Sequence, residues 1–463
     1  MKTIEDTTTS LDIVKNIKSA GFKAFFVGGF VRDLLIGINK EKMSDLDILT
    51  NASVEDIIKI FGSQNVKQVG KSFSICLVNG IEIASCRADS YRSSELSKIS
   101  QSSKSKLYDS FPECDLAHRD ITINSMALDP LTNTIIDPFN GRKDLEDKII
   151  RFTGSPEERI FEDPLRMVRV CRFASMIQGT IDSSTLSSIV KHRHLVTKSV
   201  APERLRNEII KAMAYKKPSL FFKALNSAKL LEFIFPSLSR CCELDGGPHH
   251  GETVFEHCLM SGDALSPRNP ILRLAGFLHD AGKYDAAQIK DGQLTFIDHE
   301  KMGQSIIYDL EKLRFSCEEI NFIDSVIKTH MRPLKADSTP KAVRRLLAFL
   351  KEHGVEWQTF MQMRIADKSA NLAKKPYTQE DIKLRVGKIW NELKNANLKG
   401  ASLPLSVKEL AISGDDVMEI LNISPSPEVG KVMNYLFESV LDEPCLNKFE
   451  ILKELVITYN SKN

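Results

Sequence analysis

The chain has 463 residues, of which 42% are hydrophobic and 27% are charged, a composition typical of globular proteins and not of disordered or fibrous chains. A chain of this length exceeds the number of residues that usually form one hydrophobic core, and it predicts two to four domains. The 63 basic and 61 acidic residues leave a net charge of +2, which excludes a global positive field, so any contact with nucleic acid must be local.

Targeting and redox signals are also absent from the sequence. No stretch approaches the ~18 apolar residues that span a bilayer, and the start, MKTIEDTTTS, has no apolar run. We therefore expect a cytoplasmic protein with no membrane partner. The nine cysteines include no C-x-x-C pair, which predicts reduced and buried thiols instead of disulfides or a four-thiolate zinc site.

The first 115 residues alternate short apolar runs with turn signals. An Asn-Gly pair between two apolar runs is a strong hairpin signal. A long polar stretch without apolar periodicity indicates a functional or mobile loop. These patterns predict, in chain order, a helix from Ser10 to Gly21, a strand over 23–27, a helix over 31–36, a strand over 46–49, a helix over 54–61 capped by Ser53, a hairpin of 74–78 and 81–85 across Asn79-Gly80, and a loop from Arg87 to Asp115.

After Ile136 the strand signals fade and helical periodicity continues to the C-terminus. The predicted fold class is therefore α+β, with an N-terminal α/β domain containing a small mixed sheet and an all-α remainder. The segment from Lys191 to Lys217 holds eight basic residues against two glutamates. It is a candidate RNA contact, although a solvated helix face would have the same pattern.

A glycine turn and two nearby carboxylates occur in GGFVRDLLIGINKEKMSDLDILT, which begins at Gly28. Alternate side chains of a strand share a face, so Asp45 and Asp47 are expected to project together. Like carboxylates repel unless a cation lies between them, and Mg²⁺ is usually held by one or two carboxylates plus substrate phosphates. Gly28 and Gly29 offer backbone N–H groups to an anion at a helix start, and Arg32 can add a bidentate phosphate contact. Together they predict a nucleoside-triphosphate and magnesium site.

These residues resemble the signature of the class II nucleotidyltransferases, the family of tRNA nucleotidyltransferases (CCA-adding enzymes) and bacterial poly(A) polymerases. Over about the first 215 residues, further segments follow in the family's order: HRDITINSMALD from His118, DPFNGRKDLEDKIIRFTG from Asp137, EDPLRMVRVCRF from Glu162 and PERLRNEIIKAM from Pro202. The resemblance implies that Asp45 and Asp47 are catalytic and hold Mg²⁺, and that Gly28, Gly29, Arg32 and Arg119 bind the nucleotide. His118 stands where the family usually has arginine, and we interpret it as a solvent-exposed replacement.

In EDPLRMVRVCRF, Asp163, Arg166, Arg169 and Arg172 are three positions apart, so successive residues drift by about 60° around a helix. An ion-paired surface helix would show the same spacing. The resemblance implies instead that these positions face the nucleotide. Asp163 and Arg166, held by one another, would present donors and acceptors to the edge of C or A, and the other two arginines would contact phosphate or hold the pocket.

Six of the ten histidines lie between His249 and His330. A single buried histidine is more often structural, but this set, with its adjacent His-Asp pair, resembles the HD superfamily of metal-dependent phosphohydrolases. The resemblance implies the ligands His257, His279, Asp280 and Asp367, with His299 and His330 as further candidates. Imidazole and carboxylate ligands suit a transition metal such as Ni²⁺, Mn²⁺ or Zn²⁺, which would activate water for attack on phosphorus.

One bacterial subgroup of CCA-adding enzymes carries such an HD domain, associated with phosphatase and 2′,3′-cyclic phosphodiesterase activity. The resemblance therefore implies a bifunctional enzyme that adds CCA to the 3′ end of tRNA from CTP and ATP, with its oligomeric state open. It also implies four parts: a catalytic head over 1–153, a nucleotide-selecting and RNA-binding helical region over 154–245, an HD domain over 246–370 and a tRNA-binding helical region over 371–463.

Three alternatives remain. A poly(A) polymerase of the same class tends to carry an Arg-Arg-Phe element after its second helix, where this chain has VGKSFSI from Val69 to Ile75. A partial enzyme would add only CC or only A, although the long loop after Arg87 argues against the CC-only type. From a different class, an HD phosphohydrolase could use its N-terminal domain only to bind RNA, an interpretation that the intact Asp45 and Asp47 disfavour.

Overall fold

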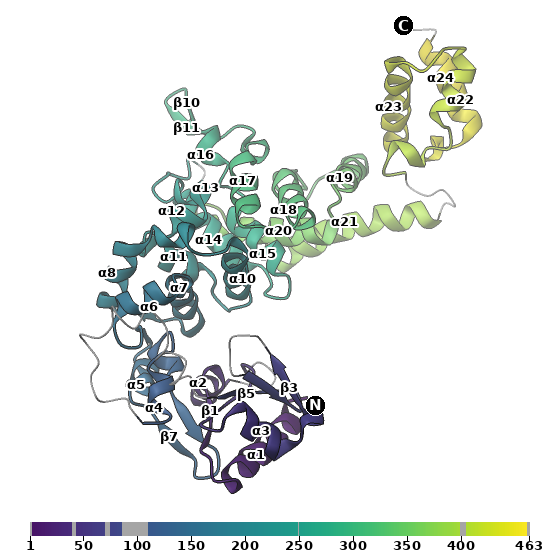
Figure 1. Cartoon of the computed structure of the whole chain (residues 1–463). Coiled ribbons are helices and arrows are strands. Elements are labelled where there is room, and N and C mark those ends of the chain that lie inside the picture. Colours follow the sequence, from purple (N-terminus) through teal and green to yellow (C-terminus); the bar gives the residue numbers. More distant parts are fainter. Residues whose placement is uncertain are drawn as a thin grey trace. The chain divides into compact units, whose positions relative to one another are not determined.

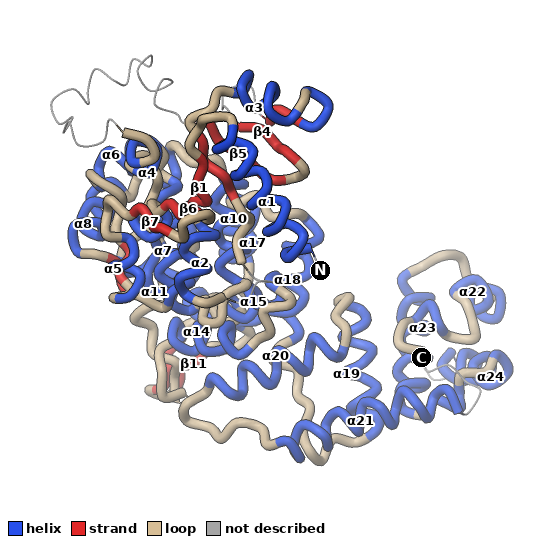
Figure 2. Tube along the Cα trace, turned by 90° about the horizontal axis from the view of Figure 1, so that it is seen from below, coloured by secondary structure: helices blue, strands red, loops and turns tan. Residues whose placement is uncertain are grey.

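The computed structural model describes residues 2–38, 43–69, 75–85, 110–248, 250–398 and 404–460. The chain forms two compact units, Met1–Phe233 and Ile234–Asn463 (Figure 1). Within the described residues, strands belong to the first unit except for one short hairpin in the second (Figure 2).

The first unit contains a seven-stranded sheet with strand order β3-β4-β5-β2-β1-β6-β7. Neighbouring strands are antiparallel except for β2 and β5, which are parallel, so the predicted mixed sheet is confirmed. The strands are β1 (Ala24–Val27), β2 (Asp47–Thr50), β3 (Val66–Val69), β4 (Ile75–Val78), β5 (Ile81–Ser85), β6 (Ala127–Asp129) and β7 (Thr134–Ile136), with a separate pair β8 (Ile149–Ile150) and β9 (Thr180–Ile181).

Helices flank this sheet and form the rest of the first unit. Those of the sheet region are α1 (Lys2–Ser19), α2 (Gly29–Ile36), α3 (Val54–Phe61), α4 (Glu113–Leu116) and α5 (Gly141–Glu146). The following helices are α6 (Pro156–Glu162), α7 (Leu165–Ile177), α8 (Ser183–His192), α9 (Leu195–Lys198), α10 (Pro202–Met213), α11 (Ser219–Ser227) and α12 (Leu231–Ile234). Helix α7 packs against α10 and α11.

Alternation along the strands divides the core of the sheet into two faces. Ile48 of β2 packs in the cluster that includes residues of α1 and α3, whereas its neighbour Leu49 packs with Leu116 of α4. Each such buried side chain contributes roughly 1.5–3 kcal/mol relative to exposure. Because side chains two residues apart share a face, Asp47 lies on the α4 side.

Most elements predicted near the N-terminus are confirmed, including α2, α3 with its Ser53 capping box, and the β4-β5 hairpin. The predicted start of α1 is wrong, because no glycine or proline interrupts the segment before Ser10 and the helix begins at Lys2. Strand β2 begins at Asp47, because its partner β1 ends opposite that residue, at Val27, where the chain turns. Asp45 therefore precedes the strand.

Three further expectations need correction. Helix α4 occupies the end of the stretch predicted as a loop, whose residues 86–109 lie outside the described part of the chain. The short strands from β8 onward were not predicted, because two or three residues are too few to show alternation. The eight cysteines that the structure describes are free, as expected, but Cys317 and Cys445 are exposed instead of buried.

The second unit is predominantly helical. Its helices are α13 (Pro236–Ser239), α14 (Val254–Ala264), α15 (Pro270–Leu278), α16 (Lys283–Ala286), α17 (Gln304–Lys312), α18 (Cys317–Thr329), α19 (Pro340–Glu352), α20 (Trp357–Ala370), α21 (Gln379–Leu398), α22 (Gly414–Leu421), α23 (Pro427–Asp442) and α24 (Phe449–Asn460). Strands β10 (Gln288–Lys290) and β11 (Gln293–Thr295) form its hairpin. Helix α14 packs against both α15 and α20. Among the described residues, no helix is long and apolar enough to cross a membrane.

Candidate functional site

The turn between β1 and α2 brings the backbone close to polar side chains. Gly28 has a φ of 74°, and a Cβ added there would lie 2.9 Å from Nη1 of Arg119 and 3.8 Å from Oδ2 of Asp47. A Cβ on Gly29 would lie 2.7 Å from Oγ of Ser44. Glycine permits both the left-handed φ and the close approach. Gly28 as N-cap makes no side-chain hydrogen bond to the first N–H groups of α2, which suits anion binding.

Three carboxylates gather beside this turn. Asp47 of β2 is paired in register with Glu82 of β5, and Asp45 lies two residues before Asp47. Burial, the charge of Glu82 and the charge of Asp45 raise the pKa of Asp47 to about 6, although Arg119 opposes the shift. A divalent cation would relieve this repulsion, so the oxygen-rich donor set fits Mg²⁺.

Glu82 is a candidate metal ligand that the sequence analysis missed. It is the only carboxylate in the apolar strand Ile81–Ser85, which was a usable local signal. Its proximity to Asp47 depends on the parallel pairing of β5 with β2, which no local pattern specifies.

Arg32 has a different environment from the one predicted. Its guanidinium is buried and donates hydrogen bonds to Asp33, Asn124 and Ser44. Asp33 in turn accepts hydrogen bonds from the backbone N–H and the hydroxyl of Ser44, at 2.8 and 2.6 Å. The guanidinium is thus occupied by protein partners in this structure, and the phosphate contact of Arg32 stays a prediction.

Arg119 is better placed to meet a phosphate. Its guanidinium lies against Gly28 and makes a 3.4 Å ion pair with Asp115, and its Nε is buried without a hydrogen-bond partner. The neighbouring His118 is partly buried and not exposed as expected, and burial lowers its pKa. The carbonyl of His118 accepts a hydrogen bond from Arg166.

The predicted pair of Asp163 and Arg166 is not formed in this structure. Asp163 is the residue after α6, outside the helix that carries the three arginines, and accepts two hydrogen bonds from Arg204. Arg166 instead pairs with Glu162 on the preceding turn. The chain leaves the helical conformation at Asp163, between α6 and α7. Asp163 and Arg166 therefore lack the regular helical spacing that the prediction assumed.

The other two arginines of α7 hold neighbouring elements. Arg169 donates to Asp120 through Nε and Nη2, at 2.9 and 2.6 Å. Burial acts to raise the pKa of Asp120, but the charge and hydrogen bonds of Arg169 outweigh it and lower the pKa. Arg172 pairs with the buried Glu208 of α10. Of the two predicted roles, the contacts of these arginines favour holding the pocket over phosphate binding.

In the second unit, the structure brings together all of the predicted histidine-site residues. One carboxylate oxygen of Asp280 lies 3.6 and 3.5 Å from Nε2 of His257 and His279, and the other lies 3.0 and 3.4 Å from Nε2 of His299 and His330. The remaining candidate, Asp367 of α20, lies 3.0 Å from Nε2 of His257 and 3.9 Å from that of His279.

The tautomers of this cluster suit a metal ion. The Nδ1 atoms of His279, His299 and His330 contact the carbonyls of Gly276, Phe296 and Ile327, so each ring, when neutral, directs an Nε2 lone pair toward Asp280. These three Nε2 atoms are buried and make no hydrogen bond of acceptable geometry. Burial lowers the pKa of His279 to about 3, despite the neighbouring carboxylate. Lone pairs that face carboxylate oxygens at these distances fit a cation between them.

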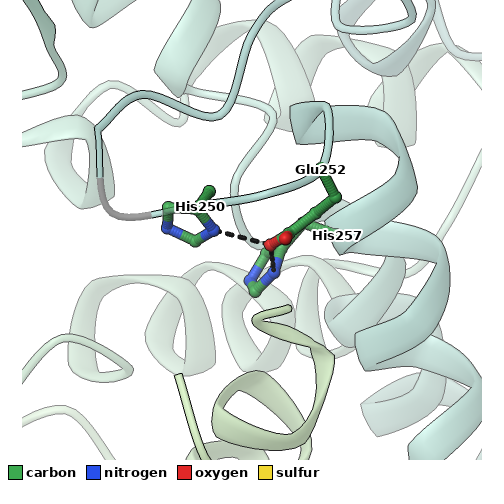
Figure 3. A group of neighbouring side chains, drawn as sticks. All are labelled: His250, Glu252 and His257. Carbon is green, nitrogen blue, oxygen red and sulfur yellow. Dashed lines mark hydrogen bonds and ion pairs between the residues drawn. The ribbon is translucent and has the colours of Figure 1, made fainter. Parts of the chain in front are cut away.

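A buried glutamate borders the cluster. Glu252 precedes α14, and its Oε1 lies 2.7 Å from Nδ1 of His250 and 3.0 Å from Nδ1 of His257 (Figure 3). On the same side, the ammonium of Lys283 lies 2.8 Å from Asp280 and 3.5 Å from Nε2 of His250. Glu252, His250 and Lys283 were not predicted, although HHGE and HDAGK place them close in sequence to the predicted ligands.

Three family models match separate parts of the chain. They are the poly(A) polymerase head domain over 24–151, a probable RNA-binding site of polymerase A over 180–242, and a putative domain 2 of tRNA nucleotidyltransferases over 301–456. None of these three is an HD domain, so that part of the resemblance stays a prediction.

Individual relatives extend this finding. The CCA-adding enzyme of Ligilactobacillus salivarius is 28% identical over 96% of this chain and 95% of its own length. Poly(A) polymerase I of Haemophilus influenzae is 33% identical over 50% of this chain and 52% of its own. Among solved structures, the CCA-adding enzyme of Bacillus stearothermophilus in complex with CTP has a TM-score of 0.66 at 21% identity, covering 99% of this chain and 98% of that one. This last likeness defines the fold.

The head-domain match, the glycine turn and the carboxylates on β2 define an enzyme of the nucleotidyltransferase class. Within that class, the chain is similar to the class II CCA-adding enzymes.

Proposed function

We propose that this chain adds CCA to the 3′ end of tRNA without a nucleic-acid template, using CTP and ATP and releasing pyrophosphate. The observation that carries the proposal is the approach of Asp47 and Arg119 to Gly28, which places carboxylates and a phosphate-binding cation at one turn. The similarity to CCA-adding enzymes over nearly the whole chain supports it.

In this proposal the first N–H groups of α2 and the guanidinium of Arg119 bind the triphosphate. Asp45 and Asp47 hold Mg²⁺, with Glu82 beside them. Bound Mg²⁺ neutralises charge on the phosphates and lowers the pKa of the attacking hydroxyl. The 3′ oxygen of tRNA forms a bond to the α-phosphorus as the bond to the pyrophosphate oxygen breaks.

Nucleotide choice is assigned to the start of α7. Asp163 and Arg166 would meet the edge of the base, and Arg169 and Arg172 would keep α7 against the head and α10 through Asp120 and Glu208. For Asp163 to contact the base, at least one of its hydrogen bonds to Arg204 must break.

Coverage of relatives bears on the main alternatives. The poly(A) polymerases match about half of this chain, as do some CCA-adding enzymes, whereas the CCA-adding enzymes of Ligilactobacillus salivarius and Enterococcus faecalis match it over 96% and 97%. This favours CCA addition over an open-ended A tail. Partial addition of CC or A stays an alternative that only the products distinguish.

The histidine cluster supports a second activity, metal-dependent hydrolysis of phosphate esters such as 2′,3′-cyclic phosphates. His257, His279, Asp280 and Asp367 would hold Ni²⁺, Mn²⁺ or Zn²⁺, with His299 and His330 as additional ligands. Such a metal supplies an activated water. The specific support is the set of buried Nε2 atoms without hydrogen bonds around Asp280.

Pyrophosphate release tests the first activity against a protein that only hydrolyses phosphate or binds RNA. Purified protein is incubated with Mg²⁺, CTP or ATP, and a tRNA transcript that lacks CCA. Acceptor-dependent pyrophosphate release supports nucleotidyl transfer. Release of inorganic phosphate alone would assign turnover to the histidine cluster and contradict the proposal.

A further inference from the structure

Several hydrogen bonds of the second unit meet at the carboxylate of Glu252. This residue is buried, with only 6% of its surface exposed. Besides the two imidazole Nδ1 atoms at Oε1, its Oε2 accepts hydrogen bonds from the backbone N–H groups of Gly251 and Leu372, at 2.9 and 3.0 Å. Figure 3 shows the carboxylate between the rings of His250 and His257. An ionised carboxylate only accepts hydrogen bonds, so both Nδ1 atoms must carry their protons in this arrangement.

His257 differs from the other histidines of the cluster in what orients it. His279, His299 and His330 each contact a carbonyl three residues earlier in their own segment. A substitution changes a side chain and leaves these backbone carbonyls in place. The Nδ1 of His257 instead depends on one side chain from the loop before α14.

The same carboxylate reaches the other end of the ligand set. Leu372 follows α20, whose last turn carries Asp367, and Asp367 contacts His257 across 110 positions of sequence. Glu252 therefore links the loop before the first predicted ligand to the segment just after the last one. A shift of its carboxylate would move both sides of the site.

We propose that Glu252 is the positioning residue of the metal site formed by the histidine cluster, a role that rests on the proposed second function. Its carboxylate keeps a proton on Nδ1 of His257. Nε2, which meets the carboxylate of Asp367 at 3.0 Å, is then the nitrogen that gives up its proton to bind the metal. It also holds the segment after Asp367 at the distance where that carboxylate meets His257. A metal-ligating imidazole whose other nitrogen donates to a carboxylate is a more basic ligand and is fixed in orientation.

The test uses the full chain with ¹⁵N-labelled histidine and the variant Glu252→Gln, which keeps the size of the side chain. Long-range proton–nitrogen spectra of the metal-free protein report which ring nitrogen of His257 carries the proton, and the signal is assigned by its loss in His257→Gln. Calorimetric titration with Mn²⁺ or Ni²⁺ alone reports metal affinity. The matched control is Glu256→Gln, four positions away, which removes the capping-box carboxylate of α14 but faces no ligand of the cluster.

We expect a protonated Nδ1 of His257 in the wild type, full or partial loss of that proton in Glu252→Gln, and a 10- to 100-fold fall in metal affinity in that variant only. An Nε2–H tautomer in the wild type, or an unchanged tautomer and affinity in Glu252→Gln, would overturn the proposal. Equal losses in both variants would assign the effect to the start of α14 and overturn it too.

Failure of the second function gives a different result. If the wild type binds neither metal, the metal site is refuted, while the tautomer of His257 still decides whether Glu252 orients that ring. If Glu252→Gln does not fold, the wild-type spectrum alone still shows whether Nδ1 of His257 carries a proton, and so whether Glu252 orients that ring. The two Trp residues, Trp357 and Trp390, both lie in the second unit, so their fluorescence reports whether that unit is folded in each variant.

Discussion

Asp163 accepts hydrogen bonds from both terminal nitrogens of Arg204, at 3.1 and 2.7 Å, although the residues are 41 positions apart. The side chain of Arg204 is half exposed, so this pair contributes little to stability, of the order of 0–1 kcal/mol. Its position points to a functional role, in which Arg204 fixes where the Asp163 carboxylate lies before a base is bound.

Replacing Asp163 is therefore expected to affect nucleotide use more than replacing Arg204. Asp163→Ala removes an acceptor proposed to contact the base and should lower kcat/KM for CTP and ATP by about 10- to 100-fold, the value of a charged hydrogen bond. Arg204→Ala should lower it by less. Steady-state addition to a tRNA acceptor measures both, and a larger loss in Arg204→Ala would contradict this order.

Gly28→Ala should reduce nucleotidyl transfer strongly, because the new Cβ would meet Nη1 of Arg119 at 2.9 Å. Gly37→Ala is a matched control. Gly37 has a φ of 73°, close to that of Gly28, but open space surrounds its Cβ position. Both variants introduce backbone strain, of about 1–2 kcal/mol at Gly37, whose ψ of 34° is left-handed helical, and more at Gly28, whose ψ of −139° lies near a region almost exclusive to glycine. If single-turnover rates fell equally in both, strain and not the position of Arg119 would explain the defect.

Acid should weaken the first unit through Asp120. Burial acts to raise the pKa of this carboxyl, but Arg169 lowers the pKa by a larger amount. The pKa of folded Asp120 therefore lies below the unfolded value of about 3.9. The stabilisation is present above about pH 4 and is lost as pH falls through the folded pKa. Asp120→Asn should cost about 3 kcal/mol near pH 7, because it leaves Arg169 only the 3.8 Å contact with Glu208 as a charged partner, and less below pH 4.

Urea unfolding between pH 3 and pH 7 measures this difference by far-UV circular dichroism. Fluorescence provides an internal control, because both tryptophans lie in the second unit. A loss in Asp120→Asn that is constant across this pH range would contradict the assigned linkage.

Local sequence patterns predicted the parts of the site that depend on neighbours in the chain. The turn at Gly28 needs a positive φ that glycine adopts readily, and the helix after Ser53 begins with a serine side chain that accepts a hydrogen bond from Asp56 three residues on. The order of histidines and aspartates likewise predicted a set of residues that the second unit brings together, although it missed His250 and Glu252 beside them.

Non-local pairing explains what the sequence could not predict. Arg32 was expected to contact phosphate, and its hydrogen bond to Asn124 could not be foreseen because the two residues are 92 positions apart in the sequence. Glu82 was missed because only the pairing of β5 with β2 places it opposite Asp47. In the same way, the partner of Asp163 proved to be Arg204, on a different helix, and not the arginine three positions further on.

Asp280→Asn should separate the two proposed activities. It removes the charge that faces four imidazoles and Lys283, so hydrolysis of a 2′,3′-cyclic phosphate substrate and binding of Ni²⁺ to the histidine cluster should be lost. Addition of nucleotides to tRNA should remain, because the carboxylates proposed to be catalytic, Asp45 and Asp47, belong to the first unit. Loss of both activities in a variant with unchanged tryptophan fluorescence would contradict two independent sites.

The most direct test of the central claim is the product made on tRNA transcripts that end before CCA, after C or after CC, with Mg²⁺ and with CTP and ATP supplied separately and together. The account predicts that wild-type protein completes CCA in order on each acceptor and then stops, and that Asp47→Ala extends none of them. An open-ended A tail, addition of only CC or only A, or full extension by Asp47→Ala would contradict it.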